Sequence, residues 1–269
     1  MRQVFQFYIN QYIHVALATT ALTAVSYVYF VLPLDVPVLL TTFLSTLLGY
    51  HFIRWSNNRF QFDVENTWSI LFMILSFGGI LLVLKELHFY QRLLLIPVGL
   101  LTVAYAVPVV RVKNQWHTLR QIPQLKIFVI ALAWTLMTVA IPLYKHYTSF
   151  DFLVEFVQRF VFIIAVTIPF DIRDYWSDTQ DLMTLPQKTG VERSKQVGML
   201  LMLLFFMLIF PMSHLLSYGI LSELGVFILV ILFLYNVSPD NDKYYTSFWV
   251  EATPVLWVLD VWFWFLILH

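Results

Sequence analysis

The apolar run 160–169 is followed directly by Phe170-Asp171-Ile172-Arg173-Asp174-Tyr175-Trp176-Ser177-Asp178. At about 100° per residue, aspartates at positions i, i+3 and i+7 lie on one face of a helix. Carboxylates at the end of a membrane helix are costly unless something pairs with them, and Mg²⁺ is usually held by one or two carboxylates together with substrate phosphates. The segment therefore indicates a metal–phosphate site at a membrane surface. The alternative is a solvated loop just beyond the end of a helix.

The composition of the chain is that of a protein that crosses a membrane several times. Of its 269 residues, 60% are hydrophobic and 12% are charged, and the mean hydropathy is +0.76, whereas about 25% of the residues of a soluble domain are charged. The formal net charge of zero gives no electrostatic support to nucleic-acid binding. The absence of cysteine excludes disulfides and thiolate metal sites. We expect an integral, multi-pass protein of a bacterial inner membrane.

Apolar stretches long enough to span a bilayer, about 20 residues each, recur along the chain. They predict an all-α integral membrane protein with nine transmembrane helices in a single domain, 1–269, and the expected spans are 12–32, 37–54, 68–84, 90–110, 124–144, 153–170, 197–215, 219–236 and 249–268. Polar residues within these spans are expected to be mainly Ser and Thr bonded to their own helix backbone.

The distribution of basic residues predicts the orientation in the membrane. With a cytoplasmic N-terminus, twelve of the 16 Lys and Arg fall in cytoplasmic segments, and the four outside are Lys85, Arg92, Lys145 and Arg159. Because cytoplasmic loops carry the excess of Lys and Arg, this bias places the C-terminus outside the cell. It also places the aspartate segment on the cytoplasmic side.

Beyond Asp178 the chain continues through Asp181 to Thr184-Leu185-Pro186-Gln187-Lys188-Thr189-Gly190. An Asp-rich segment followed by Thr-Leu-Pro, a Gly and a basic helix start resembles the second Asp-rich motif of the UbiA prenyltransferase superfamily. The resemblance implies a UbiA-like bundle of nine helices, with motifs in the cytoplasmic loops after helices two and six. It also implies that a prenyl diphosphate binds through Mg²⁺ and that the prenyl group is transferred to an aromatic or lipid acceptor with loss of diphosphate.

By this resemblance Asp171, Asp174 and Asp178 would be catalytic and would hold Mg²⁺ against the diphosphate. Arg173 would either bind phosphate or pair with a neighbouring aspartate. The other basic candidates for the diphosphate lie in the loops after helices four and six, and they are Arg111, Lys113, Arg120 and Lys188. Arg binds phosphate oxygens bidentately and Lys acts as a point charge. The alternative is that these cations only follow the positive-inside bias and contact anionic lipid.

The end of the second expected helix departs from the family pattern. Family members there resemble Asn-Asp-x-x-Asp-x-x-x-Asp, whereas this chain has His51, Arg54 and Asn58 at the same spacing. One interpretation is that Arg54 and His51 replace a second Mg²⁺ and, with Asn58, contact the diphosphate directly. Another is that prenyl transfer is lost and the pocket binds an isoprenoid lipid. A displaced alignment, in which Asn57, Asn58 and Asp63 supply oxygens, and simple anchoring of helix two at the headgroups are further interpretations.

The leading hypothesis is therefore a membrane-embedded prenyltransferase-like protein. Its cofactor would be Mg²⁺, and its partners would be a prenyl diphosphate, an unidentified acceptor and the lipid bilayer. The alternative is a non-catalytic protein of the same fold that binds an isoprenoid lipid or a protein partner. A small-molecule transporter is disfavoured because the polar residues gather at one rim rather than at the bilayer midplane. Glu251, at the start of the last helix, is expected near the mouth of the pocket.

Overall fold

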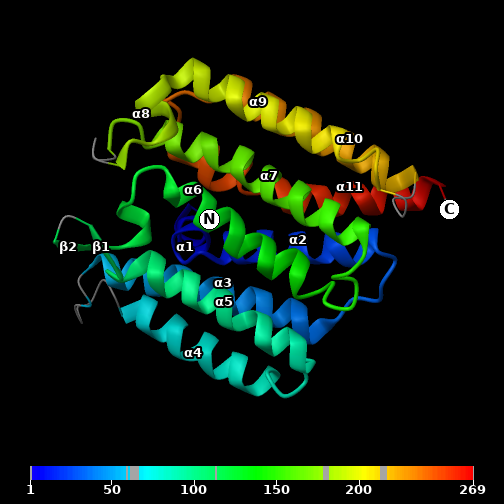
Figure 1. Cartoon of the computed structure of the whole chain (residues 1–269), viewed down its shortest axis with the longest axis horizontal. Helices are drawn as coiled ribbons and strands as arrows, with labels where there is room; N and C mark the ends of the chain where they lie inside the picture. The colour runs from blue at the N-terminus through cyan, green and yellow to red at the C-terminus, as the bar shows by residue number, and fades with distance from the viewer. Residues whose placement is uncertain are drawn as a thin grey trace.

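The computed structural model describes residues 2–58, 60, 67–112, 114–177, 182–212 and 217–268. Helices dominate this part of the chain (Figure 1). They are α1 (Arg2–Asn10), α2 (Ile13–Tyr29), α3 (Val36–Asn57), α4 (Thr67–Val83), α5 (Phe89–Ala106), α6 (Leu125–Thr135), α7 (Phe150–Arg173), α8 (Leu185–Thr189), α9 (Val191–Met207), α10 (Ser217–Asn236) and α11 (Thr253–Leu268). Shorter helical turns of other types are η2 (Leu119–Gln121), η3 (Leu136–Ala140) and η5 (Tyr245–Val250). An antiparallel hairpin of β1 (Val110–Val112) and β2 (Gln115–His117) follows α5.

Each expected span overlaps a helix, but several boundaries differ. The chain bends by 58° between α1 and α2, where Tyr12 has a left-handed backbone with φ of 58°. The fourth span ends at Ala106 rather than at residue 110, because the residue before Pro108 is pushed out of the helical region and the chain enters the hairpin. The fifth continues from α6 into the π-helical turn η3 and ends as a helix at Ala140.

Length and hydropathy support several membrane crossings in the described part of the chain. Five helical segments are long and apolar enough to cross a bilayer, or six if the bent pair α1–α2 forms one span. Two shorter apolar segments are Thr67–Val83 and Leu125–Ala140. Apolar side chains such as Leu82, Ile96 and Leu100 face outward, as a lipid-facing surface requires. The chain is therefore an integral, multi-pass membrane protein.

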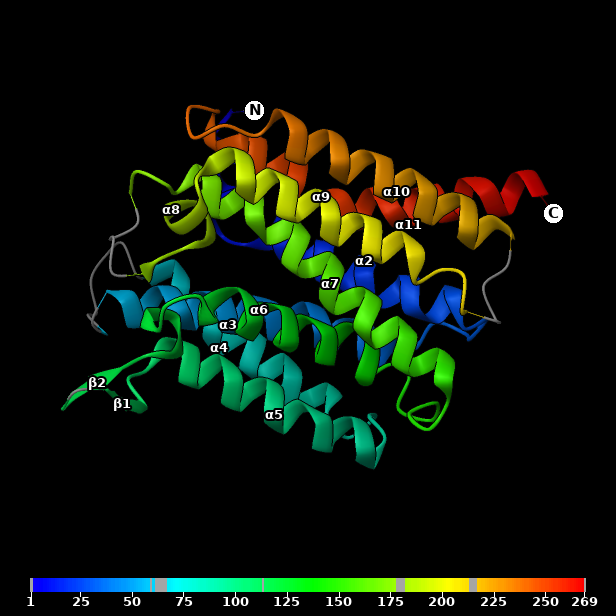
Figure 2. The ribbon, with the colours of Figure 1, turned by 45° about the horizontal axis from the view of Figure 1, so that its top comes forward.

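The helices are stacked in layers, and α7 lies between the layer of α9 and α10 and the layer of α6 and α2 (Figures 1 and 2). α7 packs on α9 and on α6, α10 packs on α11, and α3 packs on α2 and α4. The larger apolar core includes the buried side chains of Phe162, Phe205 and Trp257. Because α6 and α7 are consecutive and antiparallel, the last turn of α7 lies beside the first turn of α6.

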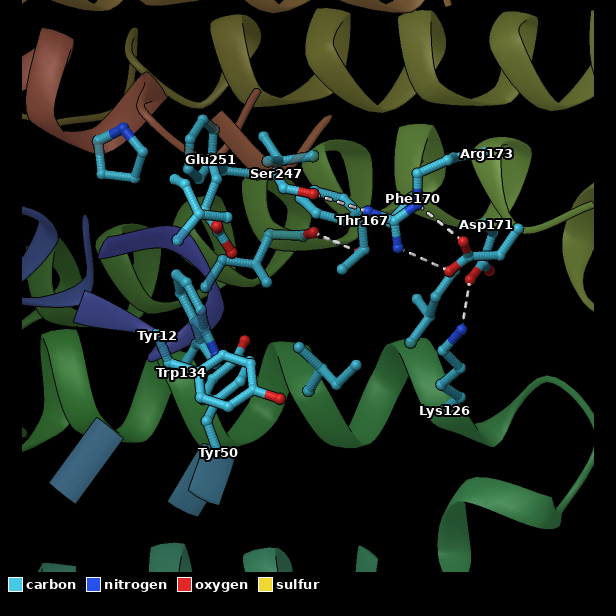
Figure 3. A pocket seen from close by; sticks show the side chains of 18 of the residues that line it. Tyr12, Tyr50, Lys126, Trp134, Thr167, Phe170, Asp171, Arg173, Ser247 and Glu251 are labelled. Atoms are coloured by element: carbon cyan, nitrogen blue, oxygen red, sulfur yellow. Dashed lines mark hydrogen bonds and ion pairs between the residues drawn. The ribbon is translucent and has the colours of Figure 1, made fainter. Parts of the chain in front are cut away.

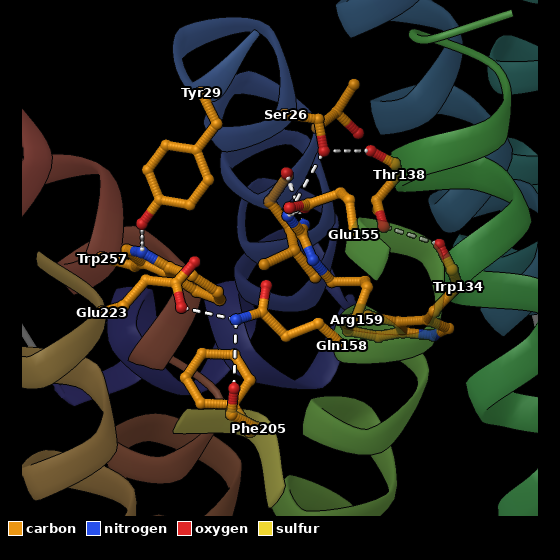
Figure 4. A network of polar contacts seen from close by, with 12 residues as sticks. Ser26, Tyr29, Trp134, Thr138, Glu155, Gln158, Arg159, Phe205, Glu223 and Trp257 are labelled. Atoms are coloured by element: carbon orange, nitrogen blue, oxygen red, sulfur yellow. Dashed lines mark hydrogen bonds and ion pairs between the residues drawn. The ribbon is translucent and has the colours of Figure 1, made fainter. Parts of the chain in front are cut away.

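A connected set of buried polar side chains lies inside this core (Figure 4). On α7, Arg159 forms an ion pair with Glu155 and donates to the Leu22 carbonyl at 2.7 Å. Gln158, also on α7, donates to Glu223 Oε2 on α10. Most buried polar side chains in the described residues are Ser or Thr, as expected, but the sequence did not predict this buried set of charged and amide side chains. Arg159, counted among the outer basic residues, is 1% exposed, because it faces α2 within the bundle, where Glu155 and the Leu22 carbonyl hold its guanidinium.

Candidate functional site

A cavity of about 630 Å³ lies between the α1–α2 bend, α3, α6, α7 and the η5–α11 segment. Its apolar and aromatic lining includes Ile127, Ile130, Trp134, Phe162, Ile163, Val166, Phe170 and Pro254. Its polar lining includes Asn10, Arg54, Lys126, Thr167, Asp171, Arg173, Asp174, Ser247 and Glu251. A largely apolar cavity with a few convergent polar groups is the usual form of a site for a small molecule.

The charged groups gather at the end of the cavity where the helices begin or end. Arg54 lies in the last turn of α3, Lys126 in the first turn of α6 and Arg173 at the end of α7, and we call these three side chains the cationic rim. Trp134 lies nine residues after Leu125, the first residue of α6, and is on the deeper side of the cavity (Figure 3). Glu251 also points into the cavity on that deeper side, as Figure 3 shows. Glu251 therefore lines the pocket, but on its deeper side and not at the mouth where it was expected.

The first ion pair of the rim joins α6 to α7. Lys126 Nζ lies 2.9 Å from Asp171 Oδ1, and the two side chains are 22% and 4% exposed. The left-handed backbone of Gln124 directs the chain into α6, and Lys126 follows in the first helical turn. Lys126 is not among the residues predicted for the site, and its pairing with Asp171 was not predicted either. The sole signal in the sequence is a single Lys at the start of an apolar run.

The second ion pair lies within the aspartate segment itself. Arg173 holds Asp174 bidentately, with Nε 2.7 Å from Oδ1 and Nη2 2.9 Å from Oδ2. Its Nη1 donates to Thr246 Oγ1 at 2.9 Å and to Ser247 Oγ at 3.0 Å. The guanidinium also lies 5.3 Å from the centroid of the Phe170 ring. Arg173 therefore ties the end of α7 to η5, and of its two predicted roles the pairing with a neighbouring aspartate is present, with Asp174 as the partner.

Arg54 is the third cation of the rim. Its Nη1 donates to the Asn10 carbonyl at 3.2 Å, which joins α3 to the end of α1. A guanidinium carries five N–H donors in a planar fork, so this contact leaves donors for other acceptors. Arg54 therefore brings a positive charge to the cavity.

Two other predicted residues do not line the cavity. His51 is fully buried, with Nε2 3.2 Å from the Gln11 carbonyl and its ring stacked on Phe72 at 4.9 Å between centroids. Arg111 lies on the exposed strand β1, opposite Trp116. Burial in the first case and the turn at Pro108 in the second keep these side chains from a ligand in this cavity.

The remaining predicted residues have other positions. Arg120 and Lys188 line a second cavity on the other side of the Lys126–Asp171 pair. Asn58 is the C-terminal cap of α3 and directly follows its last residue, Asn57. The predicted site residues Asp178 and Lys113 lie outside the described residues.

The described residues do not fit a Mg²⁺ site built on two aspartate motifs. Among them, no three His, Asp or Glu side chains gather where they could hold a metal ion. Asp171 and Asp174 each accept hydrogen bonds from a cation, and a divalent ion would have to displace both cations. The donor set of the rim fits an anionic group bound by Arg and Lys better than it fits a metal ion.

Comparison with known proteins identifies the fold. No protein-family profile and no curated protein match the sequence, but solved structures match nearly its whole length. A structure of digeranylgeranylglyceryl phosphate synthase has a TM-score of 0.59 at 13% identity and covers 99% of this chain and 98% of its own. The structure of a UbiA homologue from Archaeoglobus fulgidus bound to GPP and Mg²⁺ has a TM-score of 0.61 at 12% identity, with 97% and 98% covered. The chain therefore has the fold of the UbiA prenyltransferases.

Proposed function

We propose that the protein binds a prenyl diphosphate and transfers its prenyl group to an acceptor. The diphosphate would lie at the cationic rim and the prenyl chain in the apolar part of the cavity. The observation that carries the proposal is one cavity that joins Arg54, Lys126 and Arg173 to an aromatic interior. A solved neighbour of the same fold is bound to GPP and Mg²⁺, which supports this class of ligand.

The three cations of the rim would serve the diphosphate in different ways. Arg54 has N–H donors beyond its contact with Asn10 and would bind phosphate oxygens directly. Arg173 uses Nε, Nη1 and Nη2 to hold neighbouring side chains, so its contribution would be mainly its charge. Lys126, in its ion pair with Asp171, would supply an ammonium that can turn toward a phosphate. Together these charges would stabilise the leaving diphosphate.

Prenyl transfer breaks the C1–O bond of the donor, and its electron pair leaves on the diphosphate. A new bond forms between C1 and a nucleophilic atom of the acceptor, which then releases a proton. The aromatic faces of Trp134, Phe162 and Phe170 line the cavity, and such faces attract cations. They would therefore stabilise the allylic cation while the apolar walls exclude water. Glu251 is our candidate to accept the proton of the acceptor.

The proposal includes nine transmembrane spans and a cytoplasmic N-terminus in a bacterial inner membrane. With Arg159 in the core, the basic residues outside are reduced to Lys85, Arg92 and Lys145, which supports the orientation further. The cationic rim would then face the cytoplasm. The resemblance implies that Mg²⁺ takes part in diphosphate binding, whereas Asp171 and Asp174 are paired with cations. The requirement for Mg²⁺ is therefore tested directly.

The test is the binding of geranyl S-thiolodiphosphate, a donor analogue that resists ionisation, to the purified chain in detergent. Titration calorimetry is run once with Mg²⁺ and once with EDTA. We expect saturable binding that is weakened about tenfold in Arg54→Gln, the effect of one lost charge-assisted hydrogen bond. Lys195→Gln is the matched control, because Lys195 pairs with Glu192 on α9 and does not line the cavity. A folded protein that binds the analogue in neither condition would contradict the proposal.

A second candidate function is a non-catalytic isoprenoid-binding protein. The observation that favours it is the pairing of Asp171 with Lys126 and of Asp174 with Arg173, which engages both described carboxylates of the motif. The two functions differ in turnover. Release of pyrophosphate from geranylgeranyl diphosphate, measured with a panel of phenolic and lipid acceptors, supports the transferase. Tight binding without release of pyrophosphate supports the non-catalytic protein.

A further inference from the structure

A second cavity, of about 360 Å³, lies between α6, α7, α8 and α9. It shares the Lys126–Asp171 ion pair with the first cavity, so that this pair forms the wall between them. One side of the second cavity is apolar, with Ile164 and Leu201 among its lining residues. Phe128 also lines it and is 48% exposed. The cavity therefore opens to the surface that the helices present to lipid.

The other side of the second cavity is positively charged. Arg120 from η2, Lys126 from α6 and Lys188 from α8 line it. Asp171 is the carboxylate that faces them among the described lining residues, so positive charge is in excess there. Arg120 Nη1 donates to Asn57 Oδ1 at 2.8 Å, which fixes the guanidinium and leaves other N–H donors. Three cations that converge from separate elements on one cavity indicate an anionic ligand.

We propose that the second cavity binds the phosphate headgroup of a membrane-borne amphiphile, with its hydrocarbon chain along the apolar wall. The charge excess calls for an anion, and the apolar wall open to the lipid side calls for a chain. Basic pockets between membrane helices are known to take phosphate-bearing lipid headgroups. This inference does not depend on prenyl transfer, because Lys188 and Arg120 line the second cavity and not the first.

The experiment uses oleoyl lysophosphatidate as the probe and native mass spectrometry of the purified chain in a neutral detergent as the readout. Oleoyl lysophosphatidylcholine has the same chain with a zwitterionic headgroup, and inorganic phosphate has no chain. We expect one saturable lysophosphatidate adduct. Its apparent affinity should fall about tenfold in Lys188→Gln, and it should be unchanged in Lys195→Gln. We expect no comparable adduct with the other two probes.

Several results would overturn the inference. Equal binding of the zwitterionic lipid would show that the net negative charge of the headgroup is not recognised, and equal binding of inorganic phosphate would show that no amphiphile is required. An equal loss in Lys188→Gln and Lys195→Gln would show a non-specific surface charge effect. Loss of lysophosphatidate binding in Arg54→Gln, with Lys188→Gln unaffected, would move the ligand to the first cavity. Because the donor analogue is measured separately, failure here is distinguishable from failure of the proposed function.

Discussion

Lys126 Nζ on α6 lies 2.9 Å from Asp171 Oδ1 on α7, and both residues line each of two cavities. One cavity has an aromatic interior and a cationic rim. The other is open to lipid and carries Arg120 and Lys188. A single contact between two helix ends therefore takes part in both candidate binding sites.

The first prediction concerns the stability of this pair. Asp171→Asn leaves the partly buried Lys126 ammonium beside a neutral amide, so we expect the free energy of unfolding to fall by about 1–3 kcal/mol. Adding Lys126→Met to Asp171→Asn should recover part of the loss, because the ammonium that faces the neutral amide is then also removed. The measurement is a double-mutant cycle of thermal unfolding in detergent. Strict additivity of the two substitutions would contradict an energetically coupled pair.

The second prediction concerns the polar network of the core. Glu155→Gln leaves the Arg159 guanidinium without its charged partner, and removal of one member of a buried ion pair destabilises by about 3–5 kcal/mol. Glu223→Gln leaves the Glu155–Arg159 pair intact and keeps an oxygen that can accept from Gln158. We expect its effect to stay within about 1 kcal/mol.

Unfolding temperatures of these two isosteric substitutions in one detergent provide the check. Equal losses of stability, or a greater loss in Glu223→Gln, would show that the charge balance of the network is not as described.

The third prediction concerns a close helix contact at Gly198 on α9. A Cβ atom there would lie 2.6 Å from Leu234 Cδ2 and 3.3 Å from Ile168 Cδ1. Gly198→Ala should therefore destabilise by about 1–3 kcal/mol through overpacking. Gly99→Ala on α5 is the matched control, because nothing lies within 4 Å of its added Cβ, and helix propensity makes it neutral or stabilising by up to about 1 kcal/mol.

The double variant Gly198→Ala with Leu234→Ala should lose less free energy of unfolding than the sum of the losses of the two single variants, because the new methyl group then has room. A combination that is merely additive would show that Leu234 is not the obstacle.

The fourth prediction concerns the interior of the first cavity. Val166 on α7 lines it, so Val166→Phe should shorten the prenyl chain that fits. Affinity for geranylgeranyl S-thiolodiphosphate should fall by about tenfold or more, because the lost contacts are apolar, and affinity for pyrophosphate should not change. Val157→Phe is the control, since Val157 lies on the same helix, is 39% exposed and does not line the cavity. Parallel losses for both ligands would indicate a distorted rim instead.

One segment of the sequence was enough to predict the fold through its resemblance to a known family. The Asp-rich sequence after 160–169 and the Thr184-Leu185-Pro186 run that follows it predicted a UbiA-like bundle, and solved structures of that fold match nearly the whole chain. The prediction that Arg173 pairs with Asp174 was possible because the two residues are adjacent in sequence. The difference between this chain and the first Asp-rich motif of the family, at Arg54, was also visible in the sequence. The motif is recognised by local helical spacing alone, so no distant contact is needed to find it.

The partners of the other charged residues were decided only by the tertiary structure. Lys126 and Asp171 are separated by 45 positions, and only the antiparallel packing of α6 and α7 brings them together. His51 and Arg54 are one helical turn apart in sequence, yet one is buried against Phe72 and the other lines the cavity. Hydrophobic pattern and local spacing determine which segments form helices. The rotation and contact of each helix with its neighbours depend on packing across the whole bundle, and these determine which charges meet.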